Sequence, residues 1–395
     1  MEISRRGVMM PASPIRKLAP LADAAKKQGL KIYHLNIGQP DIPTPKEFFQ
    51  AVHKFTEPVL EYGPSGGIVQ LRLSVVDYFS SFGISIELDD VWITTGGSEA
   101  ILFAFWGVTD PGDEVIVLEP FYTNYNGFAV ASGIRLVPVR LSVENGFRLP
   151  SRKDIEKHIT RKTKAILICT PNNPTGTVLT KEEMFVLGQI AKERDLYLIS
   201  DEVYREFIYD GKEHTSALTL PGIEDRVIVA DSISKRFSAC GARIGFIVSR
   251  NRELMSTILK FGQARLCPPT VEQYGAVAAF RNLHRFMKPM ITEYDRRRKA
   301  LMDELSAIPG IVAPVPDGAF YTVVGLPLED ADKFASWLLT DFSKQRKTVM
   351  VAPANGFYAT PGAGKNEIRI AYVLEEKALR DAIRLLSEAL KNYKG

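Results

Sequence analysis

Short apolar runs alternate with amphipathic stretches along the chain from about residue 91. The runs read VWITTG, EVIVLEP, GIRLVPVRL, KAILICTP, LYLISDEVY, RVIVADS and ARIGFIVS. Two of the amphipathic stretches begin at Ser98 and Thr180, and each predicts a helix. Strands that are apolar throughout are typical of a sheet whose two faces are both covered by helices. The pattern therefore predicts an α/β fold built on a mainly parallel sheet.

The helix expected from Thr180 has a recognisable start. Thr180 is followed three residues later by Glu183, which is the spacing of a capping box. In such a box each side chain accepts a hydrogen bond from the backbone N–H of the other residue. This predicts the position of the helix start.

The character of the sequence changes near residue 291. A long charged stretch, EYDRRRKALMDEL, predicts a helix at 293–305. A strand-like GAFYTVV at 318–324 and two further helices complete the chain. We therefore expect two domains: residues 46–290 form the larger one, and residues 1–45 with 291–395 form a smaller α+β domain with an N-terminal arm.

Composition removes several function classes. The 395 residues include 50 basic and 46 acidic side chains without long runs of one sign, so neither nucleic acid nor an anionic membrane is expected as a partner. No apolar run approaches the roughly 20 residues that cross a bilayer, and the N-terminus lacks the apolar core of a signal peptide.

The three cysteines are few and widely spaced, which favours reduced buried thiols in the cytoplasm, with Cys240 as a packing residue. The five histidines are scattered, so no metal site is expected.

Polar residues follow four of the apolar runs. In open α/β sheets a ligand binds beyond the carboxyl ends of the strands, so these residues are candidates for a site. The four segments are Gly96-Gly97-Ser98, Asn172-Asn173-Pro-Thr-Gly176, Asp201-Glu-Val-Tyr204 and Ser232-Ile-Ser-Lys235.

Lys235 is the candidate nucleophile of this set. A lysine just past a buried strand can lose its proton and form a Schiff base with a carbonyl, although a lone lysine of this kind is more often a solvated surface residue. Ser232 and Arg243 on either side supply a hydroxyl and a planar cation, which suit a phosphate monoester. Gly97 and Ser98 would add backbone amides at a helix N-terminus, where an anion is favoured.

Asp201 ends an apolar run, so its carboxylate is expected to be partly buried and to need a cationic partner. A pyridinium nitrogen is one such partner, and its protonation makes the ring an electron sink. A helix N-cap is the structural alternative for this residue.

Taken in order, these motifs resemble a known family. The segments NNPTG, SDEVY, SISK followed by GARIG, and NEIRIAY are similar to those of the class I and II aminotransferases, which have the aspartate aminotransferase fold (fold-type I). The resemblance extends from Leu35-Asn-Ile-Gly-Gln-Pro-Asp41 to the last helices. It implies a seven-stranded-type sheet, pyridoxal 5'-phosphate as cofactor, and a ping-pong transfer of an α-amino group between an L-amino acid and a 2-oxo acid.

The resemblance also implies roles for individual residues at the cofactor. Lys235 would form the Schiff base and move the proton, and Asp201 would pair with the pyridine nitrogen. Asn173 and Tyr204 would bind the phenolic oxygen, and Tyr122 would stack on the ring, with a core aromatic as its alternative. The phosphate would be held by Ser232, Arg243, Gly97, Ser98 and Tyr62. In this family the last of these reaches the neighbouring subunit, which implies a homodimer.

At the substrate, the resemblance assigns the α-carboxylate to Arg369, with Gly38 and Asn173 beside it. A guanidinium clamps a carboxylate through two parallel hydrogen bonds and so fixes the α-hydrogen for removal. A structural salt bridge is the alternative for Arg369. The chain departs from the family at Ala242, where a glycine or tryptophan is usual, and we expect a local packing variation there.

Other readings of the motifs remain. Ser232-x-x-Lys235 also matches the serine enzymes that recognise penicillin, but their S-D-N and K-T-G elements are missing. The thirty or so residues before the family-like segment are too few for the DNA-binding domain of a regulator with this fold. A different reaction on the same cofactor, such as a carbon–sulfur β-lyase, a cyclase or a decarboxylase, is the serious rival.

No motif in the sequence identifies which substrate side chain the enzyme recognises. A dicarboxylate substrate would need a second cation, for which Arg16, Arg265 and Arg296 are candidates by position only; a structural role is the favoured alternative for each. We expect aspartate or a broad amino-acid range, with alanine and aromatic amino acids as alternatives.

Overall fold

The central element of the fold is a seven-stranded sheet. The computed structural model describes residues 1–394, and the sheet has the order β2-β8-β7-β6-β5-β3-β4. Its strands are β2 (Val91–Thr94), β3 (Glu114–Glu119), β4 (Arg135–Arg140), β5 (Thr163–Cys169), β6 (Tyr197–Asp201), β7 (Val227–Ser232) and β8 (Gly245–Val248). Strands β3 to β7 pair in parallel, whereas β8 runs antiparallel to both β2 and β7. The predicted α/β class and mainly parallel sheet are confirmed.

Helices cover both faces of this sheet, as the apolar strands predicted. Along β5, Ala165 and Leu167 pack on one face, and Ile166 and Ile168 pack on the other. On the first face lie α5 (Gly96–Val108), α6 (Asn124–Ser132) and α10 (Arg252–Arg265). The other helices around the sheet are α3 (Lys46–His53), α4 (Val69–Ser80), α7 (Arg152–Glu156), α8 (Lys181–Glu193), α9 (Ile233–Arg236) and α11 (Thr270–Phe280).

Two of the expected helix starts can be compared with the structure. The capping box of α8 is present, since Thr180 Oγ accepts from Glu183 N at 3.2 Å and a Glu183 carboxylate oxygen accepts from Thr180 N at 2.8 Å. Helix α5 begins at Gly96, two residues before the expected Ser98. Gly96 has φ +76°, which lets the chain leave β2 and enter the helix immediately.

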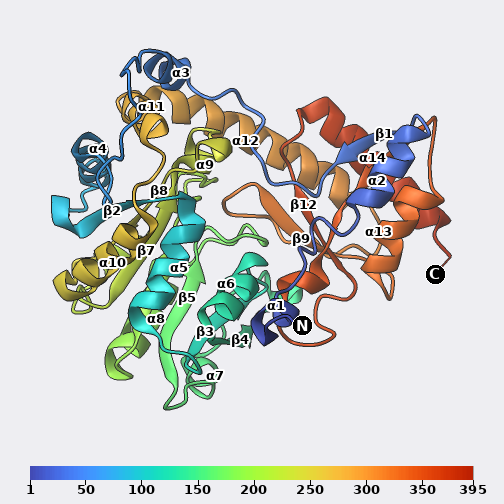
Figure 1. Ribbon diagram of the computed structural model, residues 1–395. Coiled ribbons are helices and arrows are strands. Elements are labelled where there is room, and N and C mark those ends of the chain that lie inside the picture. Colours follow the sequence, from blue (N-terminus) through green and yellow to red (C-terminus); the bar gives the residue numbers. More distant parts are fainter. Residues whose placement is uncertain (395) are drawn as a thin grey trace.

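Beside the large sheet lies a group of smaller elements, on the right in Figure 1. They include a two-stranded parallel sheet, β1-β10, and a three-stranded antiparallel sheet, β11-β12-β9. These elements are α2 (Ala19–Lys27), β1 (Lys31–His34), β9 (Tyr321–Gly325), α13 (Ala331–Thr340), β10 (Lys347–Met350), β11 (Ala352–Pro353), β12 (Glu367–Ala371) and α14 (Glu376–Asn392). The sequence predicted β9 and the two helices but missed β1, β10, β11 and β12, which are short strands of two to five residues.

Helix α12 (Leu283–Ser306) is the longest helix and runs from the large sheet to the smaller elements (Figure 1). It contains the helix predicted at 293–305 and packs against α14. The expected boundary between residues 290 and 291 lies inside this continuous helix. The division into residues 46–290 and residues 1–45 with 291–395 stays a prediction.

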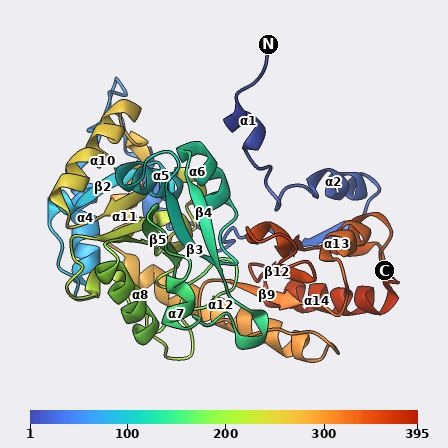
Figure 2. The same cartoon turned by 90° about the horizontal axis from the view of Figure 1, so that it is seen from below.

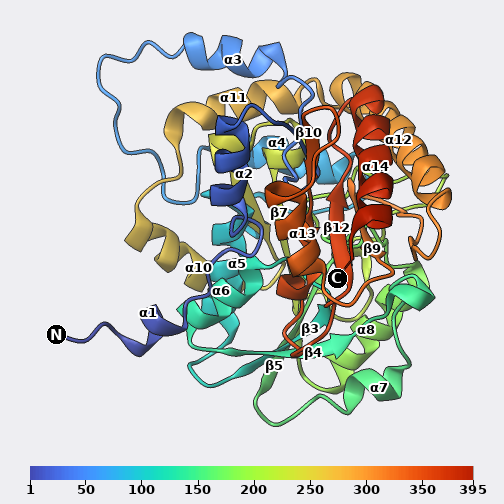
Figure 3. The ribbon, with the colours of Figure 1, turned by 90° about the vertical axis from the view of Figure 1, so that its right-hand side faces the viewer.

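The N-terminal segment lies at the edge of the molecule. Helix α1 (Arg5–Met9) has no buried residue; it stands apart from the smaller elements in Figure 2 and contacts α6, beside which Figure 3 shows it. The chain then returns to the smaller elements through α2. Within residues 1–394, none of the helices combines the length and apolar character needed to cross a bilayer.

Candidate active site

A cavity of about 610 Å³ lies between the carboxyl ends of the large sheet and the smaller elements. The sheet side contributes the ends of β6 and β7, the start of α5 and the residues around α9. The other side contributes β9, β12 and the segment after β1. The predicted site residues that line the cavity are Gly38, Gly97, Ser98, Tyr122, Asn173, Asp201, Tyr204, Ser232, Lys235, Arg243 and Arg369. Tyr62 is the one predicted residue that does not.

Lys235 enters the cavity from the single turn of α9. Ser232, the last residue of β7, caps this turn by accepting a hydrogen bond from Ser234 N at 3.0 Å. The Lys235 ammonium donates to the carbonyl oxygen of Gly38 at 2.9 Å. Its amine is thus held by a backbone acceptor from a segment about 200 residues away, where it faces the cavity.

Asp201 ends β6 and is buried at the base of the cavity. Its carboxylate accepts hydrogen bonds from the Tyr125 hydroxyl at 2.6 Å and from Val203 N at 3.3 Å. Burial raises the pKa of Asp201 to about 6, although these two hydrogen bonds and the charge of Lys235 act in the opposite direction. The chain forms turns after Asp201 instead of a helix, so the alternative role as a helix N-cap is wrong.

An anion site can form where β2 and β8 meet α5. The Arg243 guanidinium lies against Gly96, because a Cβ on that glycine would come within 2.4 Å of Arg243 Nη2. Gly97 is close to Ser232, whose Cβ would lie 3.6 Å from a Cβ on the glycine. Gly97 and Ser98 occupy the first turn of α5, where backbone N–H groups have no partner within the helix. A cation, a hydroxyl and free amides are therefore collected at one helix start.

Arg369 projects from β12 and is almost completely buried, with 1% of its surface exposed. One guanidinium nitrogen donates to Asn173 Oδ1 at 3.1 Å, another donates to the carbonyl of Asn36, and Nε has no partner. Rings of Tyr321 and Phe357 lie 4.7 and 5.0 Å from the guanidinium carbon. Burial lowers the pKa of Arg369, because no carboxylate compensates its charge. The carboxylate of a ligand would supply the negative charge that Arg369 lacks as a partner.

Aromatic residues form the rest of the wall. Tyr122 lies edge-on to Tyr125, with ring centroids 5.5 Å apart, and its hydroxyl accepts from Asn124 at 2.8 Å. Burial raises the pKa of Tyr122 to about 12. Both tyrosines line the cavity, so Tyr122 is more than a core aromatic.

Tyr321 is a site residue that the motifs did not identify. Its hydroxyl lies 2.9 Å from that of Tyr204 and donates to the Gly38 carbonyl at 3.1 Å. Tyr125 and Asn36 were missed as well. Tyr321 lies in the predicted strand at 318–324 and Tyr125 lies just after a strand end, which are the signals that could have drawn attention to them.

The three arginines considered for a distal carboxylate have different positions. Arg16 lines the cavity. Arg265 lies outside it, 3.6 Å from Glu99. Arg296 is on the outer face of α12, where it pairs with Glu293 and Glu376 at 2.8 and 2.6 Å. The structure therefore brings only Arg16 to the site.

Cys240 corrects an expectation. It was expected to be a buried packing residue, but it is half-buried and lines the cavity. Its thiol donates to the Ser234 carbonyl at 3.2 Å and lies 3.8 Å from Lys235 Nζ. After α9, Ala239 N donates to the Ser234 carbonyl at 3.1 Å, and this turn brings Cys240 beside Ser234 and Lys235. Within residues 1–394 no three His, Cys, Asp or Glu side chains are grouped as a metal site would require.

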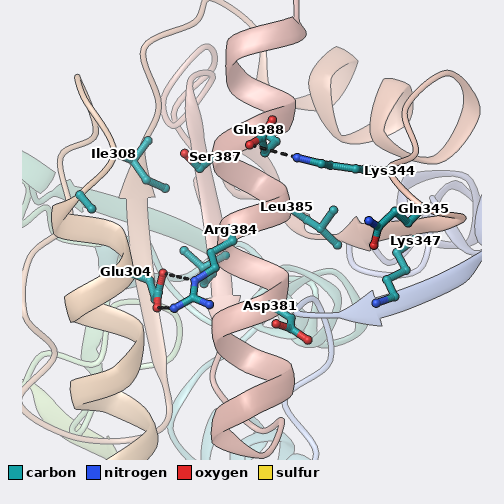
Figure 4. A pocket seen from close by; sticks show the side chains of 12 residues that line it. Glu304, Ile308, Lys344, Gln345, Lys347, Asp381, Arg384, Leu385, Ser387 and Glu388 are labelled. Atoms are coloured by element: carbon teal, nitrogen blue, oxygen red, sulfur yellow. Dashed lines mark hydrogen bonds and ion pairs between the residues drawn. The ribbon is translucent and has the colours of Figure 1, made fainter.

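A second cavity, of about 450 Å³, lies among the smaller elements between α12, α14 and β10. Figure 4 shows that its charged residues face one another: Arg384 pairs with Glu304 at 2.7 Å, and Lys344 pairs with Glu388 at 3.2 Å. These ion pairs take up four of the charged side chains that line it. The cavity around Lys235 is the one that contains the predicted site residues.

Comparison with known proteins agrees with this geometry. A family model described as aminotransferase class I and II matches residues 31–386. An aspartate aminotransferase of Pyrococcus horikoshii is 31% identical over 99% of this chain and 98% of its own length. An aromatic-amino-acid aminotransferase of Thermococcus litoralis is 32% identical over the whole of both chains. The structure of a Thermus thermophilus aspartate aminotransferase with maleate superimposes with a TM-score of 0.90, at 30% identity, over 98% of this chain and 100% of that one.

The chain belongs to the class I and II aminotransferase family. It is a transaminase with the aspartate aminotransferase fold, and enzymes of this family depend on pyridoxal phosphate.

Proposed function

We propose that this enzyme transfers an α-amino group between an L-amino acid and a 2-oxo acid by a ping-pong mechanism, with pyridoxal 5'-phosphate bound at Lys235. The observation that carries the proposal is the position of the Lys235 amine. It faces one cavity that also contains a buried carboxylate, Asp201, and two arginines, Arg243 and Arg369, each suited to a different anion.

The residues of the cavity fit this cofactor. The start of α5 with Ser232 and Arg243 offers the donors that a phosphate monoester needs. Asp201 offers a buried anion to a protonated ring nitrogen, and Asn173 and Tyr204 offer donors to a phenolic oxygen. Tyr122 offers a ring face for stacking. When bound, pyridoxal phosphate supplies an aldehyde for the amino group and a ring that delocalises the electron pair left by the departing α-proton.

Lys235 acts as the proton carrier of the site. With the cofactor bound, the Lys235 amine would accept the substrate α-proton at Nζ and return it later in the transfer. The Gly38 carbonyl, which accepts its hydrogen bond at 2.9 Å, keeps the amine directed into the cavity.

Arg369 orients the substrate. The α-carboxylate neutralises the buried charge of Arg369 and accepts a hydrogen bond from its unpartnered Nε. It binds beside Asn173 and the backbone of Gly38. This contact places the α-hydrogen toward Lys235, and such positioning contributes much of the rate in reactions of this kind.

The enzyme is proposed to act as a homodimer in which Tyr62 of one subunit reaches the phosphate of the other. Tyr62 lies outside the cavity of its own chain and is 81% exposed. Val59 and Leu60 beside it are each 64% exposed. An exposed apolar loop of this kind is costly in an isolated chain and supports burial against a second copy.

The substrate is proposed to be aspartate or a broader range of amino acids. Relatives at similar identity are named for aspartate and for aromatic amino acids, and one related structure carries maleate, a dicarboxylate.

A cytoplasmic location is also proposed. The three cysteines, none of which forms a disulfide in residues 1–394, support it.

The test is a half-reaction assay. The purified enzyme, loaded with pyridoxal phosphate, is mixed with one amino acid at a time while the absorbance of the bound cofactor is followed. We expect one equivalent of an L-amino acid to convert the cofactor to its amine form and one equivalent of a 2-oxo acid to restore it. Lys235→Ala should bind the cofactor but give no conversion.

The assay also separates this function from a carbon–sulfur β-lyase. A lyase would release pyruvate and ammonia from a suitable substrate without any 2-oxo acid. If no amino acid changes the cofactor absorbance, or if Lys235→Ala keeps full turnover, the proposed function is wrong.

A further inference from the structure

Glu119 is a buried carboxylate that binds backbone from a remote part of the chain. It ends β3 on the large sheet and has no exposed surface. Its Oε2 accepts hydrogen bonds from Ala359 N at 2.9 Å and from Thr360 N at 3.1 Å, and within residues 1–394 its Oε1 has no partner. Losing these two bonds would leave an unpartnered charge in the interior, which is costly, so the fold keeps this contact.

The contact joins the large sheet to the loop of residues 357–360, which lies between β11 and β12. A further hydrogen bond is formed beside it, because Phe121 N donates to the Phe357 carbonyl at 2.9 Å. Three hydrogen bonds therefore fix the 357–360 loop to the end of β3.

The same loop is attached to the strand that carries Arg369. The Phe357 ring is fully buried and lies 5.0 Å from the guanidinium carbon of Arg369. The Tyr358 hydroxyl donates to the Glu367 carboxylate at 2.6 Å. Glu367 and Arg369 are two residues apart on β12, so their side chains lie on the same face of the strand. The loop and β12 therefore form one unit.

On its other side, Glu119 is continuous with the wall that faces the cofactor. Tyr122 follows it by three residues. The Phe121 ring stacks on Tyr125 with centroids 6.2 Å apart, and the Tyr125 hydroxyl donates to Asp201 at 2.6 Å. The Glu119 carboxylate is thus the link between the residues proposed to hold the cofactor and the unit that contains Arg369.

We infer that Glu119 is a positioning residue that sets the place of Arg369 relative to the cofactor side of the cavity. This inference rests on the proposed aminotransferase function and adds a residue on which its substrate binding depends. An amino acid must engage the cofactor with its amine and Arg369 with its carboxylate at the same time. Such two-point binding is strong only when the two points are held at the matching separation.

The test compares a ligand that uses both points with a ligand that uses one. The first is 2-methylalanine, which has no α-proton to lose, and the second is isobutyrate, which is the same molecule without the amine. Each is titrated into the cofactor-loaded enzyme, with cofactor absorbance or calorimetry as the readout. In Glu119→Ala we expect the Kd of 2-methylalanine to rise about 10-fold and that of isobutyrate to stay within about 2-fold.

A conservative variant and a matched control complete the test. Glu119→Gln keeps an oxygen that can accept both N–H bonds, so its Kd for 2-methylalanine should return to within about 3-fold of wild type. Asp330→Ala is the control. The Asp330 carboxylate also accepts two backbone N–H bonds, from Asp332 at 3.0 Å and Lys333 at 3.1 Å, but it does not line the cavity. This variant should lower the melting temperature and leave both Kd values unchanged.

If Glu119→Ala does not fold, Tyr358→Phe tests the same connection at its other end. It keeps the ring but removes the bond to Glu367, and the Kd of 2-methylalanine should rise about 3-fold while that of isobutyrate is unchanged.

The inference is overturned if the folded Glu119→Ala variant, or Tyr358→Phe in its place, binds 2-methylalanine like wild type. Equal weakening of both ligands, or the same weakening in Asp330→Ala, would also overturn it, since either would show a general loss of structure. Failure of the proposed function looks different, because the wild-type cofactor absorbance would then respond to no amino acid.

Discussion

The hydroxyl oxygens of Tyr204 and Tyr321 lie 2.9 Å apart in the active-site cavity, although the two residues are separated by 117 positions in the sequence. Tyr204 follows β6 on the large sheet, and Tyr321 begins β9 among the smaller elements. The Tyr321 hydroxyl also donates to the Gly38 carbonyl, which accepts from Lys235 as well. This tyrosine therefore connects the cofactor side of the site to the substrate side.

Tyr321→Phe should remove the hydroxyl that links Tyr204 to Gly38 while the ring still fills its place in the cavity. The ring that lies over Arg369 remains, but the hydrogen bonds to Gly38 and Tyr204 are lost, at a cost of about 1 kcal/mol. We expect KM to rise about 5-fold for every amino acid and the pH titration of the bound cofactor's absorbance to shift. Steady-state kinetics and a spectral titration check this. An unchanged titration would show that Tyr321 acts only in packing.

Gly96→Ala should disturb the anion site. The residue has φ +76°, where an alanine is strained by about 1 kcal/mol, and the new Cβ would come within 2.4 Å of Arg243. We expect the Kd of pyridoxal phosphate, measured by fluorescence titration, to rise at least about 10-fold because Arg243 must move. Gly241→Ala is the control, since nothing lies within 4 Å of its Cβ position, and it should bind the cofactor normally.

Asp201→Asn should remove the anion that faces the ring nitrogen. The shape of the side chain and one acceptor oxygen remain, so the fold should tolerate the change. Breaking a buried charge pair costs roughly 3 kcal/mol or more, so we expect the rate of the first half-reaction to fall at least about 100-fold. Stopped-flow absorbance measures that rate. A variant that keeps the wild-type rate would exclude Asp201 from this role.

Glu202, next to Asp201, should influence acid stability. It is fully buried, and despite the cost of burial the His214 and Arg205 side chains and several hydrogen bonds lower its pKa to about 2. Its usual value is 4.5, so its stabilising contribution is complete above that pH and is lost as the pH falls toward 2.

The shift corresponds to about 3 kcal/mol. Urea unfolding of wild type and Glu202→Gln at pH 7 and pH 3 tests it: the wild type should be more stable at pH 7, and the difference should shrink at pH 3. Glu57→Gln, at an exposed position, should show no such dependence. A constant difference between wild type and Glu202→Gln at both pH values would contradict the prediction.

Much of the architecture could be predicted because it depends on local patterns. The seven apolar runs became the seven strands of the large sheet, and the Thr180–Glu183 spacing became a helix cap. The strands β1, β10, β11 and β12 were missed because they lie outside the regular alternation of apolar runs and helices; shortness alone is not the reason, since β2 and β8 have four residues each and were predicted. Their pairing depends on partners far along the chain.

The sequence by itself determined which chemical groups follow the strand ends, and parallel strands bring those ends to one edge of the sheet. That is why Asn173, Asp201, Ser232 and Lys235 could be proposed together. Only the tertiary structure decided which distant residues complete the site. Tyr321 and Arg16 reach the cavity because the smaller elements pack across the strand ends, and such contacts between remote segments leave no periodic signal in the sequence.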